Sequence, residues 1–203
     1  MSSPSKFLLA AALWLAIILP SFSQPLNDDC ANATAVAVSP AAVCGALTKG
    51  STEQATPSPL PPCAGCPNRA DVWYRFTATK TAHLVRVSDV QYLFGQSNAG
   101  LLNLSAFTGT CGNLLPLGRE TSFYTQSQLL LGNLTVGETY YLRLLCSENN
   151  ADYPVRFDIC VSTPQPPVND ECAGAAPISA DCSSQTPGSP FRATASPKDC
   201  TGQ

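Results

Sequence analysis

Histidine, methionine and charged side chains are scarce in this chain of 203 residues. It contains one His and one Met, and only 12% of its residues are charged. The 11 Lys and Arg residues are scattered singly, which excludes the clustered basic surface typical of nucleic-acid or membrane-surface binding. A single histidine leaves little for metal chemistry. These shortages make an enzyme the less favoured class of protein.

Long hydrophobic runs are also missing, with one exception near the N-terminus. Lys6 precedes a run of 13 apolar residues, Phe7–Leu19, which Pro20-Ser21-Phe22-Ser23 ends. A membrane-spanning helix needs about 20 such residues. This order of charge, short apolar run and small residues predicts a secretory signal peptide over residues 1–23, with cleavage between Ser23 and Gln24. The mature chain is therefore expected to be exported and not to span a membrane.

Cysteine, proline and glycine are abundant and agree with export. The chain has 10 Cys, 18 Pro and 13 Gly, and every cysteine follows the predicted signal peptide. In an oxidising compartment, disulfides are the expected fate of such a set. Cys63-Ala-Gly-Cys66 has the spacing of a zinc or redox pair, but no second close pair of ligands accompanies it. Structural disulfides are therefore favoured over a metal or redox site.

An internal repeat indicates tandem modules. The segment 27–33 recurs at 169–175, the segment 50–59 recurs at 188–197, and Cys44…Cys63 corresponds to Cys182…Cys200. Repetition at this spacing predicts a first module over residues 24–163, a stiff Pro-rich linker over 164–168 and the start of a second module over 169–203. The second copy is too short to offset the conformational entropy of folding. We therefore expect the chain to be the N-terminal piece of a longer, multidomain polypeptide.

Apolar and polar residues alternate with a period of two, which is typical of β-strands. The clearest segments are Val72–Thr77, Leu84–Val87, Tyr140–Leu144 and Val155–Val161, with weaker ones at 33–38, 101–107 and 127–131. No window shows a convincing helical period. The first module is therefore predicted to be an all-β, antiparallel β-sandwich with jelly-roll or Greek-key connections, stapled by disulfides.

Five motifs occur in order along this module. They are Asn27-Asp28-Asp29-Cys30-Ala31, Asp71-Val72-Trp73-Tyr74-Arg75-Phe76-Thr77-Ala78, Phe107-Thr108-Gly109-Thr110-Cys111-Gly112-Asn113-Leu114, Leu134-Thr135-Val136-Gly137-Glu138-Thr139-Tyr140-Tyr141-Leu142-Arg143 and Phe157-Asp158-Ile159-Cys160. Together they resemble an extracellular β-sandwich repeat module of secreted and surface proteins of the Bacteroidota, allied to the pre-peptidase C-terminal sandwiches. The resemblance covers nearly all of residues 27–163. It implies a spacer, adhesion unit or accessory domain, and it carries no catalytic residues.

The sequence departs from the family pattern in its cysteines. The second cysteine that usually follows the Cys111 motif is missing, and Cys66 and Cys146 are extra. We expect Cys30 to pair with Cys160, which would tie the two ends of the module together, and Cys44 to pair with Cys63, as the repeat suggests. Cys66, Cys111 and Cys146 then remain in the first module, so one of these three is expected to be free or bonded to another chain.

The acidic residues at the start of the module are a candidate cation site. Asn27, Asp28 and Asp29 could supply oxygen ligands to calcium, which takes 6–8 of them. No Asp-x-Asp-x-Asp-Gly loop accompanies them. Solvated turn residues at a domain boundary are therefore favoured, and calcium is the one cofactor that the sequence suggests.

A binding platform is the other candidate site. Trp73 and Arg75 point to the face opposite Tyr74, and Tyr141 and Arg143 alternate in the same way on another predicted strand. If that face is exposed, these four side chains suit stacking against a sugar or a peptide. If it is the core, they form no platform. The alternation alone leaves both alternatives open.

The remaining candidate for chemistry is His83, which begins a predicted strand. Neither a Gly-x-Ser-x-Gly elbow nor a His-Glu-x-x-His helix accompanies it, so a surface histidine at a strand end is favoured.

The predicted function is a non-catalytic structural or adhesion module of a multidomain protein, secreted or on the cell surface. Its expected partners are extracellular matrix, glycans or neighbouring domains, and not nucleic acid. One alternative is a carbohydrate- or calcium-dependent binding module. The other is an accessory domain of a secreted hydrolase, such as a peptidase, whose catalytic part lies beyond Gln203.

Overall fold

The computed structural model describes residues 23–58, 69–93, 101–122, 126–148, 151–165, 169 and 174–178. Almost all of the predicted signal peptide and most of the predicted second copy lie outside these ranges. Within them, no helix is both long enough and apolar enough to cross a membrane.

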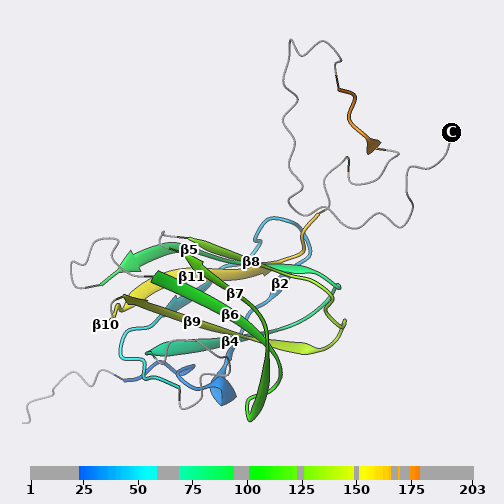
Figure 1. Ribbon diagram of the computed structural model, residues 1–203. Helices are drawn as coiled ribbons and strands as arrows, with labels where there is room; N and C mark the ends of the chain where they lie inside the picture. Colours follow the sequence, from blue (N-terminus) through cyan, green and yellow to red (C-terminus); the bar gives the residue numbers. More distant parts are fainter. Residues whose placement is uncertain are drawn as a thin grey trace, which may run out of the picture.

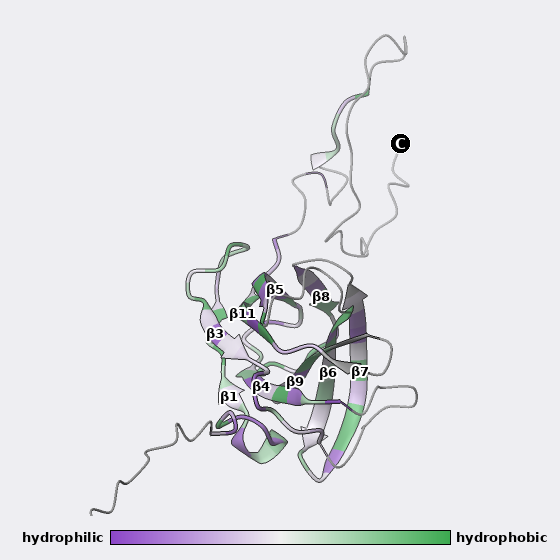
Figure 2. Cartoon of the chain, turned by 90° about the vertical axis from the view of Figure 1, so that its left-hand side faces the viewer, coloured by the Kyte–Doolittle hydropathy of each residue, from purple (hydrophilic) through white to green (hydrophobic). Residues whose placement is uncertain are grey.

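The described strands form two sheets that pack face to face (Figure 1). The first sheet contains β1 (Thr34–Ala35), β4 (Asp71–Thr77), β6 (Leu101–Thr110), β7 (Asn113–Ser122), β9 (Thr139–Glu148) and β10 (Ala151–Asp152). The second contains β2 (Val38–Ser39), β3 (Thr48–Ser51), β5 (His83–Tyr92), β8 (Ser127–Leu131) and β11 (Val155–Ser162). Figure 2 shows the two layers from the side, with β11, β5 and β8 above β4, β9 and β6. The predicted all-β sandwich is confirmed.

The strand order is β1-β4-β9-β6-β7 in the first sheet, where β10 also pairs with β9. In the second sheet the order is β2-β11-β5-β8, and β3 also pairs with β11. Two short pairings are parallel: β1 lies beside β4, and β2 lies beside β11. Residues 36–37 therefore cross from one sheet to the other, so the N-terminal segment joins the two layers along one edge.

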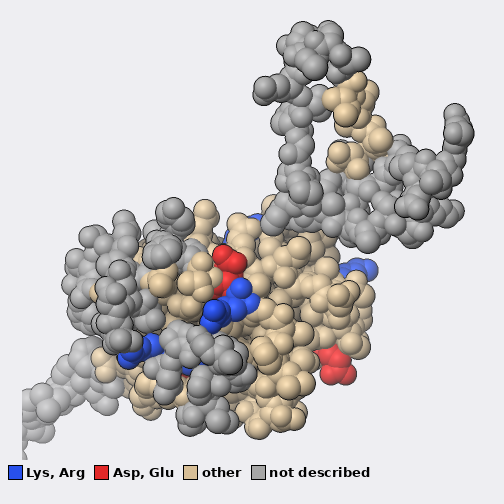
Figure 3. Space-filling view, in the orientation of Figure 1, with Lys and Arg blue, Asp and Glu red and all other residues tan. Residues whose placement is uncertain are grey.

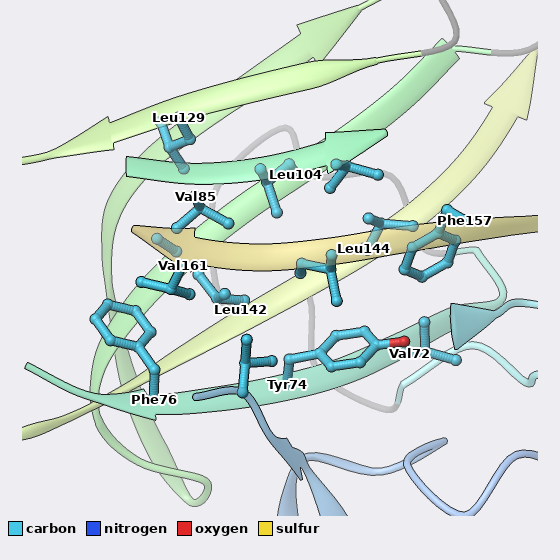
Figure 4. Packing of buried hydrophobic residues seen from close by; sticks show 14 of the residues in the cluster. Val72, Tyr74, Phe76, Val85, Leu104, Leu129, Leu142, Leu144, Phe157 and Val161 are labelled. Atoms are coloured by element: carbon cyan, nitrogen blue, oxygen red, sulfur yellow. The ribbon is translucent and has the colours of Figure 1, made fainter. Parts of the chain in front are cut away.

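The core lies between the sheets and contains the residues that the alternation placed on one face. Figure 4 shows Val72, Tyr74 and Phe76 of β4 pointing toward the second sheet, where Val161 and Phe157 of β11 lie. The Tyr74 and Phe157 rings meet edge to face at 6.0 Å between centroids. Each fully buried side chain of this size contributes about 1.5–3 kcal/mol.

Two disulfides fix the N-terminal segment to the outer faces of the sheets, and both predicted pairings are wrong. Cys30 bonds to Cys111 in the turn between β6 and β7, and Cys44 bonds to Cys160 on β11. Cys160 is thus not available to Cys30. Of the three cysteines expected to be left over, Cys111 is bonded, Cys146 is buried in the core and Cys66 lies outside the described residues. Cys63, the predicted partner of Cys44, also lies outside them. The ends of the module are not tied to each other, because each disulfide instead holds a covering segment on one sheet.

The two covering segments lie on opposite sides of the sandwich. The short 3-10 helix η1 (Cys30–Asn32) lies on the outer face of the first sheet, beside the tip of the β6–β7 hairpin (Figure 1). The loop of residues 40–47 lies on the outer face of the second sheet, where Cys160 alternates with the core residues Ile159 and Val161. We call these segments the η1 cover and the 40–47 cover.

Gly50 on β3 lies very close to two core side chains, so a larger residue at this position should lower the stability of the module. A Cβ atom at this position would overlap the Tyr74 hydroxyl and the Phe157 ring. Gly50→Ala is therefore expected to lower the free energy of unfolding by about 2 kcal/mol, which urea titration would measure. Gly132→Ala is the matched control, since an added Cβ there meets nothing within 4 Å. Equal stability of the two variants would contradict this packing.

Candidate functional site

Three cross-strand pairs line up on the outer face of the first sheet, where β4 meets β9. Trp73 pairs with Arg143, Arg75 with Tyr141, and Thr77 with Thr139. All four residues of the predicted platform therefore lie on one face of two neighbouring strands. The pairs run from the centre of β4 to its C-terminal end, and their exposure differs along the row.

Of the two alternatives left open for the four platform residues, two of these residues follow the buried one. Trp73 is only 2% exposed, in a cluster against which Cys30 of the η1 cover packs, and Arg143 is only 1% exposed. Trp73 packs against Phe107, with 5.7 Å between ring centroids, and against Ala33, which follows η1. Arg75 is exposed and Tyr141 is half-buried. The predicted platform is therefore a second small core whose rim alone reaches the surface.

A buried polar cluster lies beside this second core. The Arg143 Nε donates a hydrogen bond to Asp71 Oδ2, and the Ser58 hydroxyl donates to Asp71 Oδ1 at 2.7 Å. The Ser58 oxygen accepts from Trp73 Nε1 at 2.7 Å, and the Arg143 guanidinium lies 6.0 Å from the Trp73 ring centroid. Burial raises the pKa of Asp71, while Arg143 and Ser58 act in the opposite direction. These polar groups are directed at one another, so the cluster holds Ser58 against the sheet.

The residues of the candidate cation site make structural contacts. The Trp73 N–H donates to the Asn27 carbonyl at 2.8 Å, and Asn27 Nδ2 donates to the Trp73 carbonyl at 2.9 Å. The Asp28 carboxylate accepts from the backbone N–H and the hydroxyl of Thr56, at 2.7 and 2.6 Å. Asp29 is exposed and precedes η1. Among the described residues, no group of three or more His, Cys, Asp or Glu side chains could hold a metal ion.

These contacts give a structural reason for the internal repeat. Asp28 and its partner Thr56 recur in the second copy as Asp170 and Thr194. In the first module the Asp28 carboxylate holds Thr56 across the start of the sandwich through these hydrogen bonds.

His83 is buried, and the prediction of a surface histidine is wrong. Its Nε2 accepts hydrogen bonds from the backbone N–H groups of Thr79 and Lys80, at 3.0 and 3.2 Å. The Nδ1 atom lies 3.3 Å from the Ser162 carbonyl. A ring that accepts at Nε2 and donates from Nδ1 is neutral. The turn between β4 and β5 folds back over the imidazole, so His83 holds that turn to the end of β11.

The burial of His83 predicts a pH dependence of stability. Burial lowers the pKa of His83 from its ordinary value of 6.5, while the hydrogen bond to Ser162 acts in the opposite direction. The unfolded chain therefore takes up a proton near pH 6.5 and the folded chain only at lower pH, so stability falls as the pH decreases below about 6.5. We expect the Tm of the wild type to fall more than that of His83→Gln between about pH 7.5 and pH 5. Because both proteins carry the same carboxylates, identical pH slopes would contradict this account.

Two clefts lie near β4. The larger, of about 710 Å³, is lined by residues 23–27, by β3 and by Arg156. Its cations are paired: Lys49 lies 3.3 Å from Asp158, and Arg156 lies 2.9 Å from Glu53. The smaller, of about 420 Å³, is lined by residues 35–38 and by Arg75, Phe76, Thr77, Thr79 and Thr139. Its lining contains no carboxylate.

Charged side chains are sparse on the surface in view. Figure 3 shows a few basic and acidic groups, among them one acidic group beside a basic one near the centre, within broad areas of uncharged residues. On this face the scattered charges of the sequence do not gather into a basic patch.

β-Sandwich proteins have many different functions, so the fold alone defines only the structural class, a β-sandwich with disulfide bonds. Residues 26–159 match the model of a galactose binding domain-like family associated with the T9SS, and the chain belongs to this family. The family associates the chain with type IX secretion in the Bacteroidota and thus with a secreted or cell-surface protein. No curated protein matches the chain.

The family match confirms the coarser part of the predicted resemblance. A Bacteroidota β-sandwich module is the class that the five motifs suggested, and the galactose-binding-like fold is a non-catalytic binding fold. The relation to pre-peptidase C-terminal sandwiches stays a prediction.

Proposed function

We propose that residues 24–163 form a non-catalytic structural module that spaces or presents the neighbouring parts of an exported, multidomain protein at the cell surface. The observation that carries this proposal is that the chain is hydrogen-bonded to the sandwich where it enters and where it leaves. Asn27 makes two hydrogen bonds with the Trp73 backbone at the entrance. At the exit, the N–H and the hydroxyl of Thr163 donate to the Ser39 carbonyl at 2.9 and 3.0 Å.

Fixed ends are what a spacer requires. A chain that is held at both points passes the orientation of the sandwich to the segments before and after it. The sequence that follows, Pro164-Gln165-Pro166-Pro167, has the composition of an extended, semi-rigid linker. The predicted second copy begins directly after this linker, so the proposed arrangement is a row of modules at short, restrained spacing.

An in-frame deletion of residues 27–163 from the gene tests this proposal. We expect the exported protein to persist but its adhesion to matrix- or glycan-coated surfaces to fall. The control replaces the deleted module with an unrelated β-sandwich of similar size. This replacement restores the spacing between the neighbouring parts but not any specific binding by the module. If deletion instead abolishes turnover of a polymeric substrate by the same protein, the module is an accessory domain of a hydrolase and the proposal is wrong.

Glycan binding is the second candidate function. It is favoured by the 420 Å³ cleft, in which an exposed arginine lies among threonine hydroxyls. A glycan array probed with the mature chain tests it, and binding of at least one glycan above the background of a sandwich lacking the cleft is the expected result. An array without signal would eliminate this candidate and leave the spacer proposal intact.

Calcium dependence of such binding is open to a direct measurement. Both Asp28 oxygens already accept hydrogen bonds from Thr56, so calcium would have to displace those bonds. A ligand that binds only the folded state raises the Tm. Because we expect no such binding, millimolar calcium or a chelator should change the Tm by less than about 1 °C. A calcium-dependent rise of several degrees would show that the folded chain binds the ion and would contradict this expectation.

A further inference from the structure

We propose that the 420 Å³ cleft at the C-terminal end of β4 binds an acidic polysaccharide, with Arg75 pairing with a carboxylate or sulfate group of the sugar. This inference rests on the second candidate function, glycan binding, and names its site and the class of its ligand. The volume is within the range of small-ligand sites, about 300–1,000 Å³.

The backbone around Arg75 holds its side chain on the open part of the first sheet. Arg75 lies between Ala35 of β1 and Tyr141 of β9 in the strand register. Its neighbours along β4, Tyr74 and Phe76, face the core, so Arg75 faces outward and is exposed. The Val36 N–H donates to the Arg75 carbonyl at 2.8 Å. The site is therefore built on paired strands, which hold side chains more rigidly than loops do.

The two clefts differ in whether their basic side chains are already paired with carboxylates. In the larger cleft, Lys49 and Arg156 are paired with Asp158 and Glu53, so a bound anion would compete with a carboxylate that is already present. Within the part of the chain that the structure describes, Arg75 makes no ion pair. An anionic group that enters the smaller cleft thus meets an uncompensated guanidinium, which can bind a carboxylate or sulfate through two parallel hydrogen bonds.

The other lining groups suit a sugar ring. Thr77, Thr79 and Thr139 each supply a hydroxyl that both donates and accepts, which matches the hydroxyl groups around a pyranose. Tyr141 does not line the cleft, but it lies beside Arg75 in the register, half-buried against the Trp73 and Phe107 core. An aromatic ring held in this way presents a rigid surface at low entropic cost. A charged group flanked by hydroxyls, with an aromatic residue next to it in the strand register, fits an acidic polysaccharide better than an acidic peptide.

Calorimetric titration of the mature chain tests the proposal with four probes: polygalacturonate, chondroitin sulfate, neutral dextran and poly-glutamate. We expect binding of polygalacturonate, chondroitin sulfate or both, and none of dextran or poly-glutamate. The two acidic polysaccharides distinguish carboxylate from sulfate as the recognised group. Arg75→Ala is expected to weaken binding about tenfold or more, as loss of a charge-assisted hydrogen bond does.

Lys49→Ala is the matched control, because it removes the same charge from an exposed residue of the larger cleft. We expect it to change affinity less than about twofold, since its ion pair is at the surface. Equal losses in the two variants, or undiminished binding by Arg75→Ala, would overturn the site. Binding of neutral glycans alone would keep glycan binding and eliminate this ligand class. Equal binding of poly-glutamate would overturn the choice of a sugar, and unchanged Tm values would show that both variants fold.

Discussion

Asp71→Asn is expected to lower the free energy of unfolding by about 3–5 kcal/mol, the usual cost of removing one partner from a buried ion pair. Asp71 and Arg143 are 0% and 1% exposed in the ion pair. The asparagine still fits the space and can still accept from Ser58. What it loses is the negative charge, which leaves the Arg143 guanidinium buried without compensation.

Urea titration of a small set of variants measures this effect. Glu53→Gln is the control, because it removes a carboxylate from the exposed pair with Arg156, and it should cost less than about 1 kcal/mol. The double variant Asp71→Asn/Arg143→Met should recover most of the loss, since it removes both charges together. If Asp71→Asn and Glu53→Gln are equally stable, the buried cluster does not exist as described.

Loss of the Cys30–Cys111 disulfide is the second large effect that we expect. The bond closes a loop with a sequence separation of 81, and in the entropic model its removal costs about 4 kcal/mol. It also holds the η1 cover over Trp73. The chain has two tryptophans, and the other, Trp14, lies in the predicted signal peptide. The fluorescence of the mature chain therefore reports on Trp73 alone, and Cys30→Ala/Cys111→Ala should shift the native emission to the red.

The other disulfide supplies the control for this prediction. Cys44–Cys160 has a similar sequence separation, 116, but it holds the 40–47 cover on the opposite sheet. Cys44→Ala/Cys160→Ala should therefore lose comparable stability and keep the native emission of Trp73. A red shift in both variants, or in neither, would contradict the assignment of one cover to each sheet.

The strands were predictable from the sequence because alternation is a local signal. The predicted strand at 127–131 coincides with β8. Four other predicted strands start within one residue of the observed strand, at Val72, Leu84, Tyr140 and Val155. β7 was missed because Pro116 and Gly118 interrupt its pattern. Both residues are tolerated there because β7 is the edge strand of its sheet.

The candidate sites were less predictable because they depend on segments distant in the sequence. Alternation showed that Trp73 and Arg75 share a face, but their different exposure depends on η1, which lies some forty residues earlier. The disulfide pairs depend in the same way on which sheet each covering segment reaches. No spacing of cysteines encodes that, and the repeat pointed to Cys63 as the partner of Cys44. The burial of His83 likewise follows from a turn that closes over it.

Non-reducing peptide mapping of the exported protein tests whether the module is oxidised, with one disulfide holding the N-terminal segment on each sheet. The structure predicts linked peptides for Cys30–Cys111 and Cys44–Cys160. Linked peptides for Cys30–Cys160 or Cys44–Cys63, or recovery of these cysteines in reduced form, would contradict it.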